Sequence, residues 1–173
     1  MNLTIPQDNK ADYKKIQELN ILAFEEKKEA VLVDLLREKD EFIPQLSLVA
    51  ILNDEIVGHI LFTKIKIIDD NKKEHESLAL APMAVLLKYQ KKGIGGKLIN
   101  KGLNIATRLN YQSVIVLGHE HYYPKFGFAP TRKWNIKTPF EVPSHAFMGV
   151  KLAKNGLKNV SGIVKYPKEF DEV

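Results

Sequence analysis

The stretch YQKKGIGGKL, residues 89–98, places three glycines and two lysines directly ahead of a helical pattern. Gly93 and Gly95 permit backbone angles that a side chain would forbid, so successive N–H groups can point into one concavity. The helix expected from Ile94 adds unpaired N–H groups and the positive end of its dipole. The two lysines add positive charge beside this turn. The stretch therefore predicts a binding site for a phosphate or a pyrophosphate.

Two well-known nucleotide-binding motifs do not fit this turn. A P-loop requires a Ser or Thr after the Gly-Lys pair, whereas Leu98 follows Gly96 and Lys97. A dinucleotide fingerprint requires a third glycine where Leu98 also stands. The remaining pattern is Q-x-x-G-x-G between an apolar strand and a helix. It predicts a pyrophosphate cradle that lacks the hydroxyl needed to bind a magnesium ion.

The segments on either side of the turn alternate between helical and extended patterns. Apolar spacing predicts helices over 10–26, 28–38 and 94–109, and strands over 46–53, 56–69, 78–87, 112–118 and twice within 145–166. The charged run 69–77 is interpreted as a solvated hairpin tip, and PQ at 44–45 as a break. Pro82 marks an irregular strand position, because proline cannot donate to a sheet. This order predicts a mixed α/β fold with a partly antiparallel sheet, in one domain over 1–173.

Composition limits the classes of function. The chain has 173 residues, a formal net charge of +5 and no cysteine, which excludes disulfides and thiolate metal sites. We see no signal peptide and no apolar run long enough to cross a bilayer, so we expect a cytoplasmic protein with no membrane partner. Its lysines are spread along the chain, so nucleic acid is not the expected partner. No regular spacing of ligating residues indicates a metal.

The sequence LAPMAVLLKYQKKGIGGKLI, residues 80–99, resembles the acetyl-CoA-binding segment of the GNAT superfamily of N-acetyltransferases. Val85, Tyr89, Gln90, Gly93 and Gly95 match its signature V-x-x-x-[YF]-[QR]-x-x-G-x-[GA]. The central hairpin SLVAILNDEIVGHILFTKI and the later HYYPKFGF also resemble GNAT segments. The resemblance covers nearly the whole chain. It is closest to a bacterial group of acetyltransferases of unassigned substrate.

The resemblance implies a fold and a donor site. The GNAT acyl-CoA N-acyltransferase fold has a mostly antiparallel central sheet, flanked by helices, with splayed central strands. Strand residues would bond the pantetheine arm of acetyl-CoA, and the amides of the turn would hold its pyrophosphate. The implied coenzyme-binding residues are Met83, Ala84, Val85, Gln90, Lys91, Lys92, Gly93, Ile94, Gly95 and Gly96. Lys91 departs from the family pattern, where a small residue is common.

The resemblance also implies a catalytic tyrosine. Tyr123 lies four residues before Gly127, where many members place a general acid beside the coenzyme sulfur. A phenol with a pKa of about 10 is protonated at neutral pH and can donate to a thiolate. Tyr122 is the alternative. The general base stays open among His119, Glu120, His121 and an ordered water. We interpret His59, in an apolar strand, as structural.

The expected function is that of an acetyl-CoA-dependent N-acetyltransferase. The acetyl group would pass directly to an amine of a small molecule or a peptide. The alternative is a non-catalytic acyl-CoA-binding regulatory module on the same fold. A homodimer is one of the oligomeric states left open. Residues considered for the acceptor groove are Glu25, Glu26, Glu29, Trp134, Phe140, His145 and Phe147.

Overall fold

The computed structural model describes residues 2–172. Their contacts divide into two compact units. Unit 1 comprises the described residues of segments 1–63, 81–105 and 168–173, and unit 2 comprises 64–80 and 106–167.

Unit 1 begins with two amphipathic helices. A 3₁₀ turn (Lys10–Asp12) leads into α1 (Tyr13–Phe24), and α2 (Lys28–Arg37) follows. Asn9 caps the 3₁₀ turn by accepting the backbone N–H of Ala11 at 2.9 Å. The apolar faces of both helices pack on the sheet in a cluster with these buried members: Ile16, Leu32, Val33, Leu36, Val49 and Leu61. The helices predicted over 10–26 and 28–38 are confirmed.

The strands of unit 1 form an antiparallel hairpin with a short strand at its edge. β2 (Phe42–Leu52) pairs with β3 (Glu55–Ile68), and β1 (Leu3–Thr4) pairs with β2. Asn53 and Asp54 have φ of 48° and 67°. Two consecutive left-handed residues make the tight turn that matches the twist of a hairpin. The hairpin predicted at this turn is therefore confirmed.

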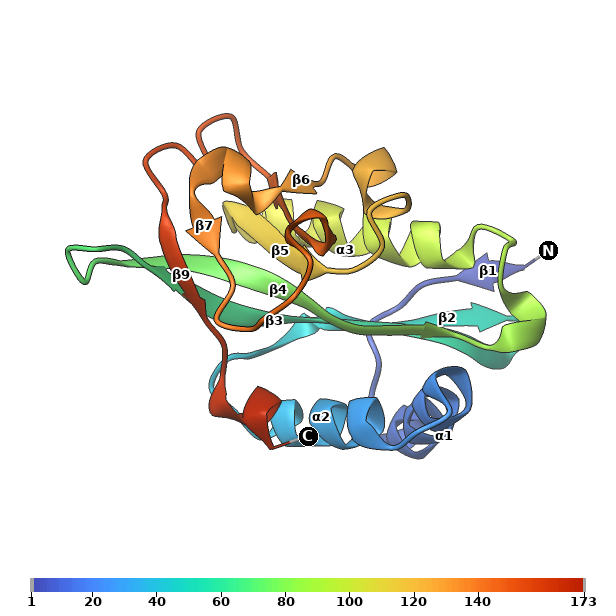
Figure 1. The fold of residues 1–173 in the computed structure, drawn as a ribbon. Coiled ribbons are helices and arrows are strands. Elements are labelled where there is room, and N and C mark those ends of the chain that lie inside the picture. Colours follow the sequence, from blue (N-terminus) through green and yellow to red (C-terminus); the bar gives the residue numbers. More distant parts are fainter. Residues whose placement is uncertain (1, 173) are drawn as a thin grey trace. The chain divides into compact units, whose positions relative to one another are not determined.

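Helix α3 (Ile94–Arg108) lies on the face of the unit 1 strands opposite to α1 and α2 (Figure 1). Two glycines allow its close approach. A Cβ on Gly58 of β3 would lie 3.1 Å from Leu98, and a Cβ on Gly102 of α3 would lie 2.2 Å from the Phe62 ring. The same Cβ on Gly58 would lie 3.3 Å from the carbonyl oxygen of Ala84, so the start of α3 and the end of β4 (Glu74–Val85) both lie close to Gly58.

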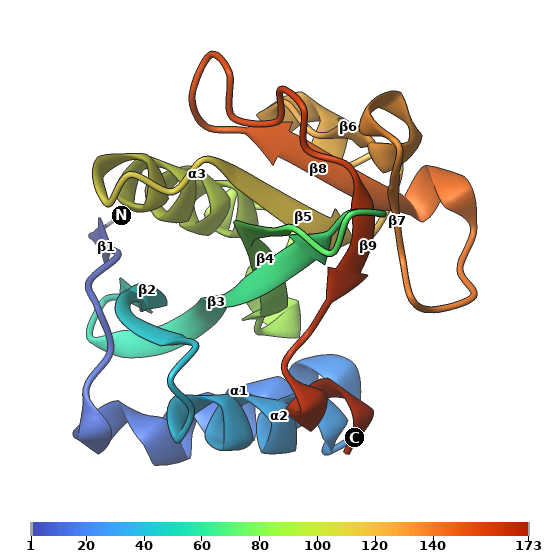
Figure 2. The ribbon, with the colours of Figure 1, turned by 90° about the vertical axis from the view of Figure 1, so that its left-hand side faces the viewer.

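Unit 2 contains the short strands of the second half of the chain. These are β5 (Ser113–Leu117), β6 (Ala129–Pro130), β7 (Ile136–Lys137), β8 (Phe147–Lys151) and β9 (Gly162–Lys165). β8 lies between β5 and β6, and β9 pairs with β3 (Figure 2). Most pairs are antiparallel, and the parallel ones are β4 with β5 and β7 with β9. The predicted mixed α/β class is confirmed.

Two boundaries predicted from the sequence are wrong. Residues 74–77, interpreted as part of a solvated tip, begin β4, where Lys66 pairs with Glu74 across the hairpin at 2.7 Å. β2 begins at Phe42, upstream of the expected break, and a register shift between Phe42 and Ser47 accommodates Pro44. Charged residues can occupy solvent-facing positions of a strand, and proline can occupy an irregular one. A prediction from apolar content alone therefore places the starts of β4 and β2 too late.

Candidate functional site

A glutamine of the Gly-rich turn, Gln90, bonds the turn to the end of β4. The Gln90 side-chain amide donates to the Val85 carbonyl at 2.9 Å, and the Leu86 N–H donates to the Val57 carbonyl at 2.9 Å. Between them, a 3₁₀ turn (Leu87–Tyr89) reverses the chain. The amide of Gln90 is thus engaged within the protein. Its role in this geometry is to fix the turn against the strand.

Tyr89 anchors the turn from its other side. Its hydroxyl donates to the Glu55 carboxylate at 2.9 Å, and the Lys88 ammonium lies 3.7 Å from the same carboxylate. The Lys92 ammonium lies 5.7 Å from the Tyr89 ring centre. The signature aromatic therefore packs the turn onto the start of β3.

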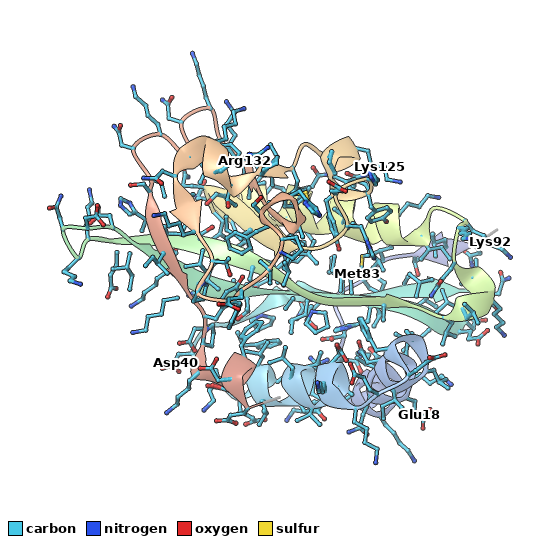
Figure 3. The ribbon with its side chains drawn as sticks, viewed as in Figure 1. Glu18, Asp40, Met83, Lys92, Lys125 and Arg132 are labelled. Atoms are coloured by element: carbon cyan, nitrogen blue, oxygen red, sulfur yellow. The ribbon has the colours of Figure 1, made fainter. Side chains whose placement is uncertain are left out.

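The turn presents an unbroken run of unpaired backbone N–H groups. Lys91 and Gly93 have φ of 61° and 84°, and the Lys97 N–H makes the bond to Gly93 that opens α3. Within residues 2–172, the N–H groups of 91–96 donate to no protein acceptor. Figure 3 places Lys92 at this turn. Free N–H groups, a helix N-terminus and lysine charge together form an anion-binding geometry.

The positions expected to bind the pantetheine arm lie just before the turn. Ala84 and Val85 are buried, and Met83 is half-buried at the end of β4 (Figure 3). Unit 1 therefore brings together all the coenzyme-binding positions predicted from the sequence, from Met83 to Gly96. Their role in binding remains a prediction.

Tyr123 lies in unit 2, at the start of a 3₁₀ turn (Tyr123–Phe126). Its ring packs on the backbone of Gly118, where a Cβ would lie 2.3 Å from the ring, and contacts Tyr122 and Phe128 edge to face. Burial raises the pKa of Tyr123 to about 12, with a smaller contribution from the neighbouring Tyr122. In the described part of the chain its hydroxyl has no hydrogen-bond partner, so the hydroxyl is available to a ligand.

The three candidate bases lie on the turn after β5. His119 is exposed and its carbonyl accepts the N–H groups of Tyr122 and Tyr123 at 3.1 and 3.3 Å. The carboxylate of Glu120 lies 3.4 Å from Nε2 of His121 and 3.9 Å from Nε2 of His145. From its sequence, His145 is expected only as a candidate for the acceptor groove, and no local sequence pattern indicates its contact with Glu120.

His59 is fully buried in unit 1 and belongs to a polar cluster of four side chains, which the sequence did not indicate as a group. Asp8 accepts Nη2 of Arg37 at 2.9 Å and the Ser47 hydroxyl at 2.5 Å, and Nε2 of His59 lies 3.5 Å away. Burial lowers the pKa of His59, and Arg37 adds to this effect against the opposing pull of Asp8. The structural interpretation of His59 fits this environment.

The remaining candidates for the acceptor groove are dispersed. Phe147 is buried, Trp134 is half-buried against the core of unit 2, and Phe140 is exposed with its ring 5.3 Å from that of Tyr166. Glu25 and Glu26 are exposed where α1 ends. None of these contacts indicates a binding site by itself.

Two kinds of site are not found in the part of the chain that the structure describes. No group of three or more His, Cys, Asp or Glu side chains there has the geometry to hold a metal ion. None of the helices between residues 2 and 172 has the length and apolar character to span a membrane.

Comparison with known proteins identifies the family. The model of the acetyltransferase (GNAT) family matches residues 13–128. Over 125 residues the chain is 42% identical to YjhQ of Escherichia coli K12, an uncharacterized N-acetyltransferase, covering 70% of this chain and 67% of YjhQ.

Two solved structures are similar throughout. The complex of E. coli YhbS with CoA has a TM-score of 0.90 at 28% identity, covering 99% of this chain and 93% of YhbS. A GNAT family acetyltransferase from Brucella melitensis, in complex with acetyl-CoA, has a TM-score of 0.79 at 28% identity, covering 98% of this chain and 99% of that one.

Proposed function

Because the chain belongs to the GNAT family of acetyltransferases, we propose that it transfers the acetyl group of acetyl-CoA directly to an amine of a small molecule or a peptide. The observation that carries this proposal is the run of free N–H groups over 91–96 at the start of α3. The family match spans parts of both units, which supports one functional domain. The proposal places the protein in the cytoplasm, without a nucleic acid or membrane partner.

The free N–H groups and the lysines of the turn would hold the pyrophosphate, with no metal needed. Two like charges on a pyrophosphate are stabilised by fixed dipoles and nearby cations at a helix N-terminus. Gln90 would act indirectly, through its bond to the Val85 carbonyl. Backbone groups of Met83, Ala84 and Val85 would bond the pantetheine arm as an added strand does.

In the reaction, the neutral amine attacks the thioester carbonyl carbon, the C–N bond forms and the C–S bond breaks. We propose that Tyr123 donates a hydrogen bond to the departing sulfur. Its pKa of about 12 lies above that of an alkyl thiol, about 8.5. Complete proton transfer to the thiolate is therefore uphill by about 5 kcal/mol. Tyr123 stabilises the developing charge while largely keeping its proton. The attacking nitrogen loses one proton to solvent as the amide forms, and solvent supplies one proton to the CoA thiolate.

Substitution of Gly93 tests the cradle. A Cβ at Gly93 meets no protein atom within 4 Å, so the cost to the fold is the strain of its φ, about 1–2 kcal/mol. Gly93→Glu adds a negative charge beside the pyrophosphate and should weaken acetyl-CoA binding at least 100-fold in calorimetry. Gly93→Gln has the same size without the charge and should retain more affinity. Undiminished affinity in Gly93→Glu would refute the cradle.

An assay for the free thiol of CoA distinguishes an acetyltransferase from a non-catalytic acyl-CoA-binding module. Wild-type protein with acetyl-CoA and a panel of amines should produce CoA faster than the uncatalysed reaction. Tight binding of acetyl-CoA without turnover on any amine would favour the non-catalytic acyl-CoA-binding module instead.

A further inference from the structure

Two segments far apart in the sequence meet at the end of β5. β5 pairs with β8 up to Leu117 and Phe147, and the next N–H, that of Gly118, donates to the Ala146 carbonyl at 2.9 Å. The turn that carries Glu120 is therefore held beside the 3₁₀ turn Ser144–Ala146, which carries His145. Backbone hydrogen bonds fix this juxtaposition, so it does not depend on the surface side chains.

The Glu120 carboxylate lies between two imidazoles of different exposure. His121 is 92% exposed in its side chain and lies 3.4 Å away, whereas His145 is 54% exposed and lies 3.9 Å away. Neighbours in sequence, such as Glu120 and His121, meet in many exposed turns without consequence. His145 is distant in the sequence, so its contact with Glu120 depends on the fold. Its side chain is exposed enough to contact a substrate.

The same turn carries Tyr123. Its N–H bonds to the His119 carbonyl, and its ring packs on Gly118. The Glu120–His145 pair and the phenol therefore belong to one locally fixed assembly within unit 2. An acetyl transfer needs a donor for the sulfur and an acceptor for the proton of the amine. This assembly contains one group of each kind.

We propose that His145 accepts the proton of the acceptor amine and that Glu120 positions its imidazole. This inference rests on the proposed acetyltransferase function. The ammonium of the acceptor gives a proton to the free ring nitrogen of His145, and the neutral amine then attacks the thioester. Glu120 faces Nε2, the other nitrogen, and stabilises the imidazolium that forms, as a carboxylate does in other acid–histidine pairs. The proton passes from His145 to solvent after turnover.

Two titratable side chains of the turn after β5 lie near His145. Glu120 faces it directly, and His121 faces the same carboxylate. β6, which packs against the 3₁₀ turn of His145, contributes only Ala129 and Pro130. Glu120 is thus the carboxylate that lies closest to the imidazole of His145.

The experiment measures kcat/KM for the amine against pH, at saturating acetyl-CoA, by thiol release. The probes are propylamine, spermidine, kanamycin and a tripeptide with a free N-terminus, and the fastest is used throughout. His145→Asn should lose about 100-fold at pH 7, within the usual range for a general base. For an amine with a pKa of about 10.4, the loss should shrink tenfold per pH unit toward pH 9, because the neutral fraction of the amine rises in that range. For the N-terminal amine of the tripeptide, with a pKa of about 8, the loss should shrink only up to about pH 8.

Matched variants separate this role from a structural one. Glu120→Gln should lose activity with the same pH trend, and Glu120→Asp should restore part of it. His75 pairs with Asp69 at 3.2 Å in the same unit, so His75→Asn removes a similar pair outside the site and should leave kcat/KM within twofold of wild type. Acetyl-CoA affinity should be unchanged in every variant.

Three outcomes overturn the inference. If His145→Asn is as active as wild type at pH 7, His145 is not the base, and the proposed acetyltransferase function is unaffected. A loss found in His121→Asn but not in His145→Asn assigns the base to the other imidazole. A wild-type protein that binds acetyl-CoA and acetylates no probe refutes the proposed function, and the inference falls with it.

Discussion

Replacing His59 by Gln should remove a pH-dependent part of the stability of unit 1. His59 is fully buried, and its Nε2 lies 3.2 Å from the Ser47 hydroxyl and 3.5 Å from the Asp8 carboxylate. Its Nδ1 is buried without a partner, so we assign the proton to Nε2, because an unpaired acceptor costs less than an unpaired donor. The amide nitrogen of Gln can take the place of this Nε2–H donor, and Gln does not titrate.

The sign of the effect follows from the lowered pKa of His59. The unfolded chain takes up a proton near the ordinary value of 6.5, whereas the folded chain resists it because burial disfavours the charge. The stabilisation is thus complete above pH 6.5 and is lost as the pH falls below it, by at most about 1.4 kcal/mol per pH unit for one proton.

Asp8 contributes in a different range of pH. Burial alone would raise its pKa, but hydrogen bonds from His59, Arg37 and Ser47 outweigh this and lower it below 3.8. The stability that Asp8 supplies is present above pH 3.8 and is lost as the pH falls through its lower folded pKa. Between pH 6.5 and 5 the difference between wild type and His59→Gln therefore isolates the histidine.

The assay is urea unfolding at several pH values from 8 to 5, followed by circular dichroism at 222 nm. Helices α1 and α2 belong to unit 1, so this signal reports on the part of the chain that holds the cluster. Fluorescence of Trp134, in unit 2, tests whether both units unfold together. At pH 8 the substitution should cost about 1 kcal/mol. Equal pH slopes in both proteins would refute the buried neutral histidine.

Three further predictions concern the turns around the candidate site. Gly118→Ala places a Cβ 2.3 Å from the Tyr123 ring, so it should cost about 1–3 kcal/mol of unfolding free energy and lower kcat without changing acetyl-CoA affinity by calorimetry. Lys91→Gly removes a left-handed lysine and should raise the melting temperature by about 2 °C, whereas Lys92→Gly, where φ is not positive, should lower it. With a pKa of about 12, Tyr123 should give a wild-type to Tyr123→Phe rate ratio that stays constant from pH 6 to 10.

The local geometry of the proposed donor site could be predicted from the sequence because its contacts join residues close together in the chain. Gln90 bonds to Val85 five residues away, and Lys97 bonds to Gly93 at the opening of α3. Such contacts depend on short-range geometry that glycine spacing and helix periodicity reveal. The hairpin at Asn53 and Asp54 was predictable for the same reason.

The other contacts are not local, and no sequence pattern specifies them. Asp8, Arg37, Ser47 and His59 come from a loop, a helix and two strands, and only the fold brings them together. A single histidine in an apolar strand indicates that a partner exists, but not which one. Burial of a charged group requires such partners, so the cluster follows from packing, which the sequence order does not display.

The proposed donor site and the proposed proton acceptor should therefore differ in how well they tolerate substitution. The proposed donor site is built from one continuous stretch, residues 83–96, in which most positions are constrained by backbone geometry or by a bond to a neighbour. The proposed proton acceptor depends on His145, in a loop whose side chains contribute little to the core. Loops of this kind tolerate substitution. We therefore expect changes over 138–144, which spare His145, to alter the preferred amine while acetyl-CoA affinity is retained.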